Sequence, residues 1–342
     1  MRFASVRLHS MAYQEPEMFL TSDEIETKLV DLYTRAKLPQ GRLELQTGIK
    51  RRGFWPVGTR SSSIASQAAE KVLKNFPREK VDLLLHASVC RDFLEPATAA
   101  QVHHNLKLSP HCMISDLSNA CLGVLSSILM AGNMIERGAI QTALIVSGEN
   151  SGPLLEETLK FLSNDPTMDR KKIKPYIASL TIGSAGVAFL LTHESLAPHG
   201  PKILGGSSLT DSASVELCQG DGTHSGLMMA TDSEALLKAG IKLSRDNWEK
   251  AKSVLGWGNS DVDKIIPHQV GSAHRFAMLN ELGLPLDRDF QTYEMYGNSG
   301  SAALPFTMIK ASEVGFFKSR DKVALLGIGS GLTSTMLGVE WI

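Results

Sequence analysis

The stretch Asp116-Leu-Ser-Asn-Ala-Cys-Leu-Gly-Val-Leu-Ser-Ser-Ile-Leu-Met-Ala-Gly-Asn-Met-Ile-Glu-Arg137 joins a small polar turn to a long apolar run. The apolar residues recur with the period of a helix, and Ser118 or Asn119 is a suitable N-cap, so we expect Cys121 in the first helical turn. There the unpaired N–H groups and the positive end of the helix dipole would favour a thiolate. The alternative is that Cys121 is a small buried hydrophobic residue, as most free cysteines are.

Apolar strands flank this helix. The segment 81–89 precedes it and 142–148 follows it, and both are nearly continuous runs of apolar residues. Such runs are typical of strands that are covered on both faces, as in a parallel sheet with helices on either side. The sequence therefore predicts an α/β fold in which this helix connects two buried strands.

The same order of elements recurs in the second part of the chain. Val262 lies 181 residues after Val81, and Ala324 lies 181 residues after Ala143. A second helix that begins with small residues is expected between them, at 301–314. Two equal offsets in matching order indicate a duplicated half rich in βαβ units.

The two copies differ in length. Gly186 best matches Gly338, at a shorter offset of 152 residues. The difference is close to the length of the polar segment 151–180, so we interpret that segment as an insertion into the first copy. The predicted division is an N-terminal half, 1–195, and a C-terminal half, 196–342, since 342 residues exceed what one core usually supports.

Composition excludes several classes of protein. The net charge of -1 lacks the basic footprint of a nucleic-acid-binding protein. No run of about 20 apolar residues predicts a transmembrane segment, and the N-terminal residues lack an apolar signal region. None of the four cysteines forms a C-x-x-C pair, so no metal site is expected. We expect a cytoplasmic protein in a reducing compartment.

Three polar residues fall where strands end and helices begin. Cys121 opens the helix of the first half, His268 ends the strand 264–270, and Asn298 directly precedes the second helix. In duplicated α/β folds ligands gather at such ends. A thiolate, an imidazole and an amide suffice for acyl transfer through a covalent thioester, with His268 supporting the thiolate or an enolate oxygen.

Backbone N–H groups complete the predicted set. The run Gly327-Ile-Gly-Ser330-Gly331 offers closely spaced N–H groups, so we expect the backbone of Cys121 and Ser330 to form oxyanion holes. The simpler interpretations are that His268 is a satisfied structural residue, that the Asn298 segment is only a turn, and that the glycines form a tight connection. These do not explain why all of these residues fall at equivalent ends of a repeated fold.

Two other classes use similar residues. A papain-like hydrolase also has Cys, His and Asn, but it carries the cysteine near the mature N-terminus in a different local motif. A non-catalytic subunit of related fold is a second alternative, which the presence of all of Cys121, His268 and Asn298 disfavours.

Four motifs in the same order resemble those of the thiolase superfamily, specifically its β-ketoacyl synthase III branch. They are Ser-Asn-Ala-Cys-Leu-Gly at 118–123, Ile-Pro-His-Gln-Val at 266–270, Gly-Asn-Ser-Gly-Ser-Ala at 297–302 and Gly-Ile-Gly-Ser-Gly-Leu at 327–332. The resemblance implies a thiolase fold, a duplicated five-layered αβαβα sandwich, and usually a homodimer.

One further segment resembles a narrower group. Ser-Val-Cys-Arg-Asp-Phe-Leu-Glu-Pro-Ala-Thr at 88–98 is similar to a segment of OleA-type enzymes, which join two fatty acyl-CoA molecules head to head in olefin biosynthesis. The resemblance implies that Glu95 enters the active site of the partner subunit as a base. A carboxylate in an apolar channel has a raised pKa, which suits removal of an α-proton. Tyr296 departs from the histidine expected in this group, and Glu95 could instead belong to a surface salt-bridge turn.

The resemblance leaves two reactions open. The first is a non-decarboxylative Claisen condensation of two acyl-CoA molecules, with no cofactor besides the CoA thioester substrates. The alternative is malonyl-dependent synthesis with an acyl carrier protein, which would dock on basic residues such as Lys238, Lys242 and Arg245 of the helix 234–255. Other expected partners are a second copy of the chain and downstream enzymes of the same pathway.

Overall fold

The computed structural model describes residues 1–223 and 226–342. Its strands are β1 (Val6–Gln14), β2 (Met18–Thr21), β3 (Arg51–Phe54), β4 (Leu83–His86), β5 (Met113–Asp116), β6 (Thr142–Glu149), β7 (Ala185–His193), β8 (Lys202–Thr210), β9 (Cys218–Thr223), β10 (Gly226–Thr231), β11 (Lys264–Pro267), β12 (Lys322–Gly329) and β13 (Thr333–Glu340). Its α-helices are α1 (Ser22–Lys28), α2 (Val30–Arg35), α3 (Arg42–Thr47), α4 (Ser61–Val72), α5 (Thr98–Leu106), α6 (Gly123–Glu136), α7 (Gly152–Asn164), α8 (Ser233–Leu255), α9 (Ser272–Leu282), α10 (Tyr293–Tyr296) and α11 (Ala303–Glu313). Within these ranges no helix has the length and apolar character needed to cross a membrane.

The principal sheet has nine strands in the order β11-β12-β13-β8-β1-β7-β6-β4-β5. Strands of the first half occupy one side of this order and strands of the second half the other. The two groups meet at β1 and β8, which share the pair Arg7 and Lys202. The predicted boundary between 195 and 196 falls in the connection from β7 to β8.

The two halves repeat the same strand pairing. In the first, β4 runs parallel to β6, β6 antiparallel to β7, and β7 antiparallel to β1. In the second, β11, β12, β13 and β8 follow the same pattern. The match of Gly186 with Gly338 is nevertheless wrong. Gly186 pairs with Gly148, whereas the corresponding Gly329 pairs with Thr333, so Gly186 corresponds to Thr333.

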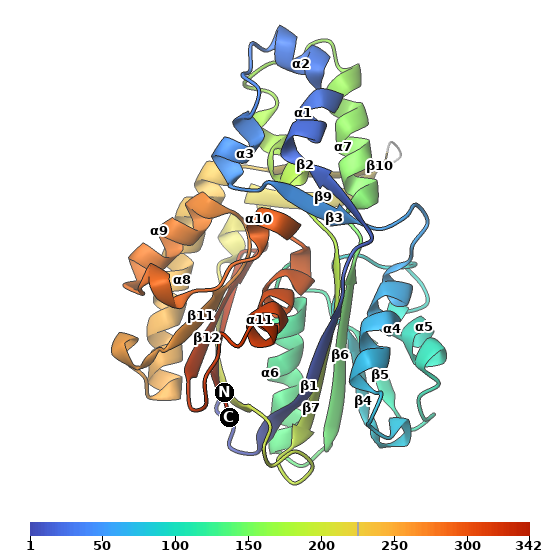
Figure 1. The fold of residues 1–342 in the computed structure, drawn as a ribbon, viewed down its shortest axis with the longest axis vertical. Coiled ribbons are helices and arrows are strands. Elements are labelled where there is room, and N and C mark those ends of the chain that lie inside the picture. Colours follow the sequence, from blue (N-terminus) through green and yellow to red (C-terminus); the bar gives the residue numbers. More distant parts are fainter. Residues whose placement is uncertain (224–225) are drawn as a thin grey trace.

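The molecule has five layers, and its hydrophobic cores lie between them. Helices α6 and α11 lie at the centre, and one core packs them between the strands of the two halves. A second core joins α4 and α5 to the outer face of the first-half strands, and a third joins α8 and α9 to the outer face of the second-half strands. This arrangement, visible in Figure 1, confirms the predicted αβαβα sandwich.

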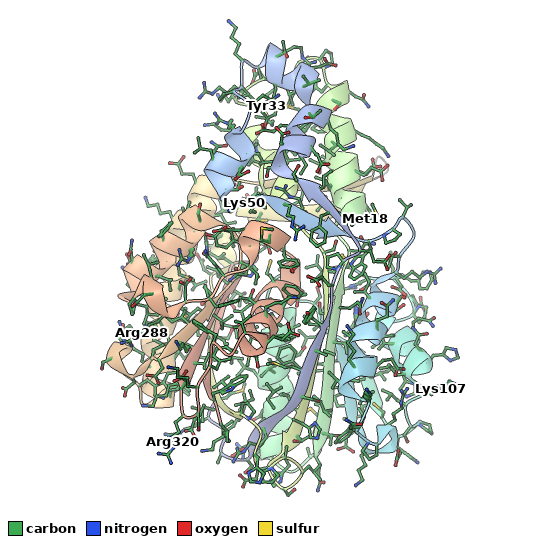
Figure 2. The ribbon with its side chains drawn as sticks, in the orientation of Figure 1. Met18, Tyr33, Lys50, Lys107, Arg288 and Arg320 are labelled. Carbon is green, nitrogen blue, oxygen red and sulfur yellow. The ribbon has the colours of Figure 1, made fainter. Side chains whose placement is uncertain are left out.

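A cap lies at one end of the sandwich. It combines α1, α2 and α3 with α7, and a separate core holds these helices together. Tyr33, labelled in Figure 2, is one of its buried side chains. The cap arises from a difference between the halves, because residues 150–184 connect β6 to β7 whereas 330–332 connect β12 to β13. The predicted insertion, 151–180, lies within the longer connection.

Candidate active site

Cys121 lies in the turn between β5 and α6. The helix begins at Gly123, after an N-cap, Leu122, that makes no side-chain capping bond. Our placement of Cys121 in the first helical turn is therefore wrong. Asn119 does not cap the helix either, since its Nδ2 donates to Ser126 Oγ at 2.9 Å. Ala120 has a φ of +45°, in the left-handed region, which makes a sharp turn directly before the cysteine.

The surroundings of Cys121 favour the neutral thiol. Burial, the carboxylate of Glu149 and the neighbouring Cys218 together raise the pKa of Cys121 to about 12, while hydrogen bonding from Asn298 acts in the opposite direction. The prediction that the helix terminus favours a thiolate is thus wrong, because burial is the largest influence on this thiol and it raises the pKa. Acyl transfer then requires a group that removes the proton of Cys121.

Asn298 presents a fixed amide to this thiol. Its backbone pairs with two residues of the segment before β7: Asn298 N donates to Thr181 O, and Gly183 N donates to Asn298 O, both at 3.0 Å. Its Oδ1 accepts a hydrogen bond from Gly300 N at 3.1 Å. Since the oxygen is occupied, the NH₂ group is the end available to a thiolate or an oxyanion. The expected donor role therefore has a structural basis.

His268 directly follows β11 and is buried. Its backbone N–H donates to Leu326 O, and its side chain is 3% exposed. Among the described residues its Nδ1 has no hydrogen-bond partner. Burial and the nearby His274 lower the pKa of His268 to about 3, so the imidazole is neutral at neutral pH. A neutral imidazole can accept the proton of a thiol.

Gln269 connects the histidine segment to the asparagine segment. Its Nε2 donates to Pro267 O at 2.7 Å, and its Oε1 accepts from the backbone N–H groups of Thr292 and Tyr293 at 2.8 and 3.1 Å. These bonds fix the start of α10, the short helix that leads into Asn298. The sequence reasoning missed this residue, although a polar side chain next to His268 was a usable signal.

Tyr296 lies outside the reacting groups. Its hydroxyl donates to Glu15, and its ring packs edge to face against Phe306 at 4.7 Å between centroids. Lys310 lies beside the same cluster, 5.7 Å from the centre of the tyrosine ring. The departure from the expected histidine is thus accommodated by a polar and aromatic cluster at the end of α10.

The end of β12 lies against Cys121. A Cβ added to Gly329 would be 3.4 Å from Cys121 N and 3.6 Å from Cys121 Cβ, so the two backbones are neighbours. Ser330 follows at once, and its Oγ donates to Cys218 Sγ at 3.3 Å. This places the backbone proposed for the oxyanion holes beside the thiol. Sequence reasoning did not anticipate Cys218, because nothing in its surrounding sequence distinguishes it.

Glu95 lies apart from these groups, on the loop between β4 and α5. It is exposed, and next to it Leu94 is 96% exposed. In the part of the chain that the structure describes, Glu95 makes no hydrogen bond or ion pair with another side chain. The chain therefore brings together Cys121, Asn298 and the segment 329–330, and leaves Glu95 at the surface.

The contacts of two other predicted features are as follows. On α8, Lys242 pairs with Asp246 at 3.1 Å, and Arg245 pairs with Glu281 at 2.9 Å. Such ion pairs are typical of a solvated helix face. They reduce the unpaired positive charge to which an acyl carrier protein could bind. Within residues 1–223 and 226–342, no group of three or more His, Cys, Asp or Glu side chains is arranged to hold a metal ion.

Comparison with known proteins identifies relatives over the whole chain. Residues 253–341 match the family model of the C-terminal part of 3-oxoacyl-[acyl-carrier-protein] synthase III. Acyl-CoA:acyl-CoA alkyltransferases from Shewanella oneidensis and Xanthomonas campestris are 37% and 36% identical, and each alignment covers 100% of both chains. A β-ketoacyl-[acyl-carrier-protein] synthase III from Natranaerobius thermophilus is 26% identical over 95% of this chain and 96% of its own.

Solved structures give the same result. A cysteine-to-serine variant of OleA from Xanthomonas campestris, with bound lauric acid and lauroyl-CoA, superposes with a TM-score of 0.94 at 35% identity, covering 99% of this chain and 100% of the other. Structures of that protein also include substitutions of a glutamate and of a histidine. The similarity is thus greater to alkyltransferases than to the carrier-protein-dependent synthase.

Proposed function

Because the chain belongs to the acyl-CoA:acyl-CoA alkyltransferase family of thiolase-fold condensing enzymes, we propose that it joins two fatty acyl-CoA molecules head to head by a non-decarboxylative Claisen condensation. The product is a 2-alkyl-3-ketoacyl chain, as in olefin biosynthesis. The proposal rests mainly on one observation, which is that the chain matches two alkyltransferases along its full length. The interaction of the Asn298 amide with the Cys121 thiol supports it.

The first half-reaction forms the acyl-enzyme. Cys121 attacks the thioester carbon of one acyl-CoA as its proton passes to the neutral imidazole of His268. The backbone N–H groups of Cys121 and Ser330 stabilise the tetrahedral oxyanion. The intermediate then collapses, and the CoA thiol leaves with the proton. The raised pKa of Cys121 makes this proton transfer a necessary part of the step.

The second half-reaction forms the carbon–carbon bond. Glu95 of the partner subunit removes an α-proton from a second acyl-CoA, and the NH₂ group of Asn298 and the ring of His268 stabilise the enolate oxygen. The carbanion attacks the acyl-enzyme carbonyl, and the Cys121 thiolate leaves. No carboxylate is lost and no cofactor takes part, since the two substrates supply all the atoms of the product.

A second copy of the chain is needed to bring Glu95 to a thiol. Strand β5 is at the edge of the nine-stranded sheet, and its first three residues are exposed. The strand itself exposes Met113 and Ile114, and the loop that follows the neighbouring strand β4 exposes Val89, Phe93 and Leu94. An unpaired strand edge with an apolar border favours association with another protein surface. We propose that two copies associate along this edge, with each loop directed to the other's active site.

The test supplies lauroyl-CoA alone and follows free CoA and product mass. Wild-type protein should release CoA and yield a condensed 2-alkyl-3-ketoacyl product. Glu95→Gln should release one CoA per active site and then stop, because acylation does not need the base. Glu79→Gln is the matched control, since Glu79 is an exposed glutamate in the 3-10 turn that precedes β4. It should behave as wild type.

Two outcomes would contradict the proposal. If a product forms only after a malonyl thioester is added, the enzyme is a malonyl-dependent synthase. If Glu95→Gln condenses lauroyl-CoA as fast as Glu79→Gln, Glu95 is not the base. Sedimentation of the wild-type protein in the same buffer measures whether the chain is a dimer under the conditions of the assay.

A further inference from the structure

We infer that Glu149 is a positioning residue that holds the Glu95 loop and the Asn298 turn in place around Cys121, an inference that rests on the proposed function. Glu149 is the last residue of β6 and only 3% of it is exposed. Within the described chain it has no cationic partner. Its acceptor capacity is instead used by three backbone N–H groups, and these come from both halves of the molecule.

The first contacts are to the start of the Glu95 loop. Val89 N donates to Glu149 Oε1 at 2.9 Å, and Cys90 N donates to Oε2 at 3.2 Å. The far end of the loop is fixed by Asp116, which accepts from Thr98 N and Ala99 N at 2.8 Å each. The loop is therefore held at both ends, and its exposed apex carries Glu95. Glu149 thus sets the direction in which this loop leaves the sheet.

The third contact is to the turn that carries Asn298. Ser301 N donates to Glu149 Oε1 at 3.0 Å. Gly300, with a φ of +56°, passes so close that an added Cβ would be 3.1 Å from Glu149 Oε1. The same Gly300 donates its N–H to Asn298 Oδ1. The carboxylate thus fixes the segment that orients the amide of Asn298.

Ser301 extends the connection to the nucleophile. Its Oγ accepts a hydrogen bond from Val124 N at 2.9 Å, in the first turn of α6 directly after the Cys121 turn. One buried carboxylate is thereby linked to the base loop, the amide turn and the helix that supports the thiol. A small displacement of such groups can lower a rate by about 100-fold.

An amide cannot replace this carboxylate. A carboxylate has two acceptor oxygens, whereas glutamine has one oxygen and an NH₂ group that only donates. In Glu149→Gln the NH₂ group must face either Cys90 N or the pair Val89 N and Ser301 N, so at least one contact is lost. Burial raises the pKa of Glu149 and its backbone donors lower it, and in its ionised form Glu149 contributes to the raised pKa of Cys121, a contribution that the substitution removes.

The experiment compares Glu149→Gln with Glu26→Gln. Glu26 is a matched control because it is also fully buried and accepts backbone N–H bonds, from Gly41 and Leu43 at 2.6 Å, but it lies in the cap. In Glu149→Gln we expect condensation of lauroyl-CoA to fall at least about tenfold more than the single-turnover release of CoA. We also expect the pH profile of Cys121 alkylation by iodoacetamide to shift to lower pH. Glu26→Gln should show neither change.

The outcomes separate this inference from the proposed function. If wild-type protein forms no product from lauroyl-CoA, the proposed function fails, and the alkylation profile alone decides the link between Glu149 and Cys121. If wild type condenses and Glu149→Gln keeps the wild-type ratio of condensation to acylation, the inference is overturned. If Glu149→Gln does not fold, the ratio of condensation to acylation is measured in Glu149→Asp instead. That variant keeps both carboxylate oxygens on a shorter side chain.

Discussion

Two buried histidines occupy corresponding places in the two halves, yet their surroundings differ. His86 ends β4, and His268 directly follows β11, the strand that corresponds to β4. The ring of His86 contacts Ser61 Oγ at 2.9 Å and Ser88 Oγ at 3.1 Å. The Nδ1 of His268 has no partner within the described residues. A buried histidine therefore lies at both strand ends, but among the described residues only the ring of His86 has hydrogen-bond partners.

The difference fits a structural role for His86 and the reactive role that we propose for His268. A buried polar group without a partner is destabilising, and most buried polar groups are hydrogen-bonded. His86 follows that rule and joins the serines that support the end of β6. The Nδ1 of His268 departs from it, and such an unpaired nitrogen is what the proposed mechanism requires. The interpretation of a lone histidine as a satisfied core residue thus describes His86 and not His268.

The largest effect is expected from His268→Asn. Removal of a group that transfers a proton usually lowers a rate by about 10²–10⁴-fold, so release of CoA from lauroyl-CoA should fall by that factor. The free energy of unfolding should change by no more than about 1 kcal/mol, because the buried Nδ1 has no bond to lose. Steady-state CoA release and urea unfolding measure the two quantities. A variant that is strongly destabilised but retains its activity would assign His268 to the core.

The reverse pattern is expected from His86→Asn. Loss of the ring contacts with Ser61 and Ser88 should lower the free energy of unfolding by about 2 kcal/mol. The rate of CoA release should stay within a few-fold of wild type at a temperature where the variant is folded. A rate loss as large as that of His268→Asn, with normal stability, would remove the distinction between the two histidines.

The sequence predicted the architecture because the fold depends on patterns of apolar residues. The buried strands, the two central helices and their duplicated order are all visible in such patterns, whereas the five layers were implied by the family resemblance. The cap was visible only as a polar segment, since its core combines residues from α1 to α3 with residues of α7, far apart in sequence. The glycine match failed for a related reason, because strand register depends on turn length rather than on residue identity.

The site was predictable to the extent that it consists of residues at element ends. Cys121, His268 and Asn298 follow from that rule, and Glu95 came only from a family resemblance. The protonation state of the thiol was predicted wrongly, since burial and Glu149 raise its pKa and neither can be read from the local sequence. Glu149 itself ends β6 as a carboxylate, but its three backbone donors are distant in sequence, so its contacts could be found only in the structure.

The smallest effect is a difference in acid sensitivity. Burial lowers the pKa of His268 to about 3, and burial, partly offset by Asp116, lowers that of His86 to about 4. An unfolded histidine titrates near 6.5, so between about pH 6.5 and 4 the unfolded chain binds protons that the folded chain does not. The contribution of these histidines to the free energy of unfolding is therefore fully present above pH 6.5 and is lost as the pH falls. At pH 5.5 each histidine should account for about 1.4 kcal/mol of that loss. Urea unfolding of His268→Asn at pH 7.5 and 5.5 should show a decrease smaller than that of wild type by this amount. If the variant loses as much stability between pH 7.5 and 5.5 as wild type does, His268 is hydrated in the absence of substrate and titrates normally. The two histidines would then differ in their access to solvent.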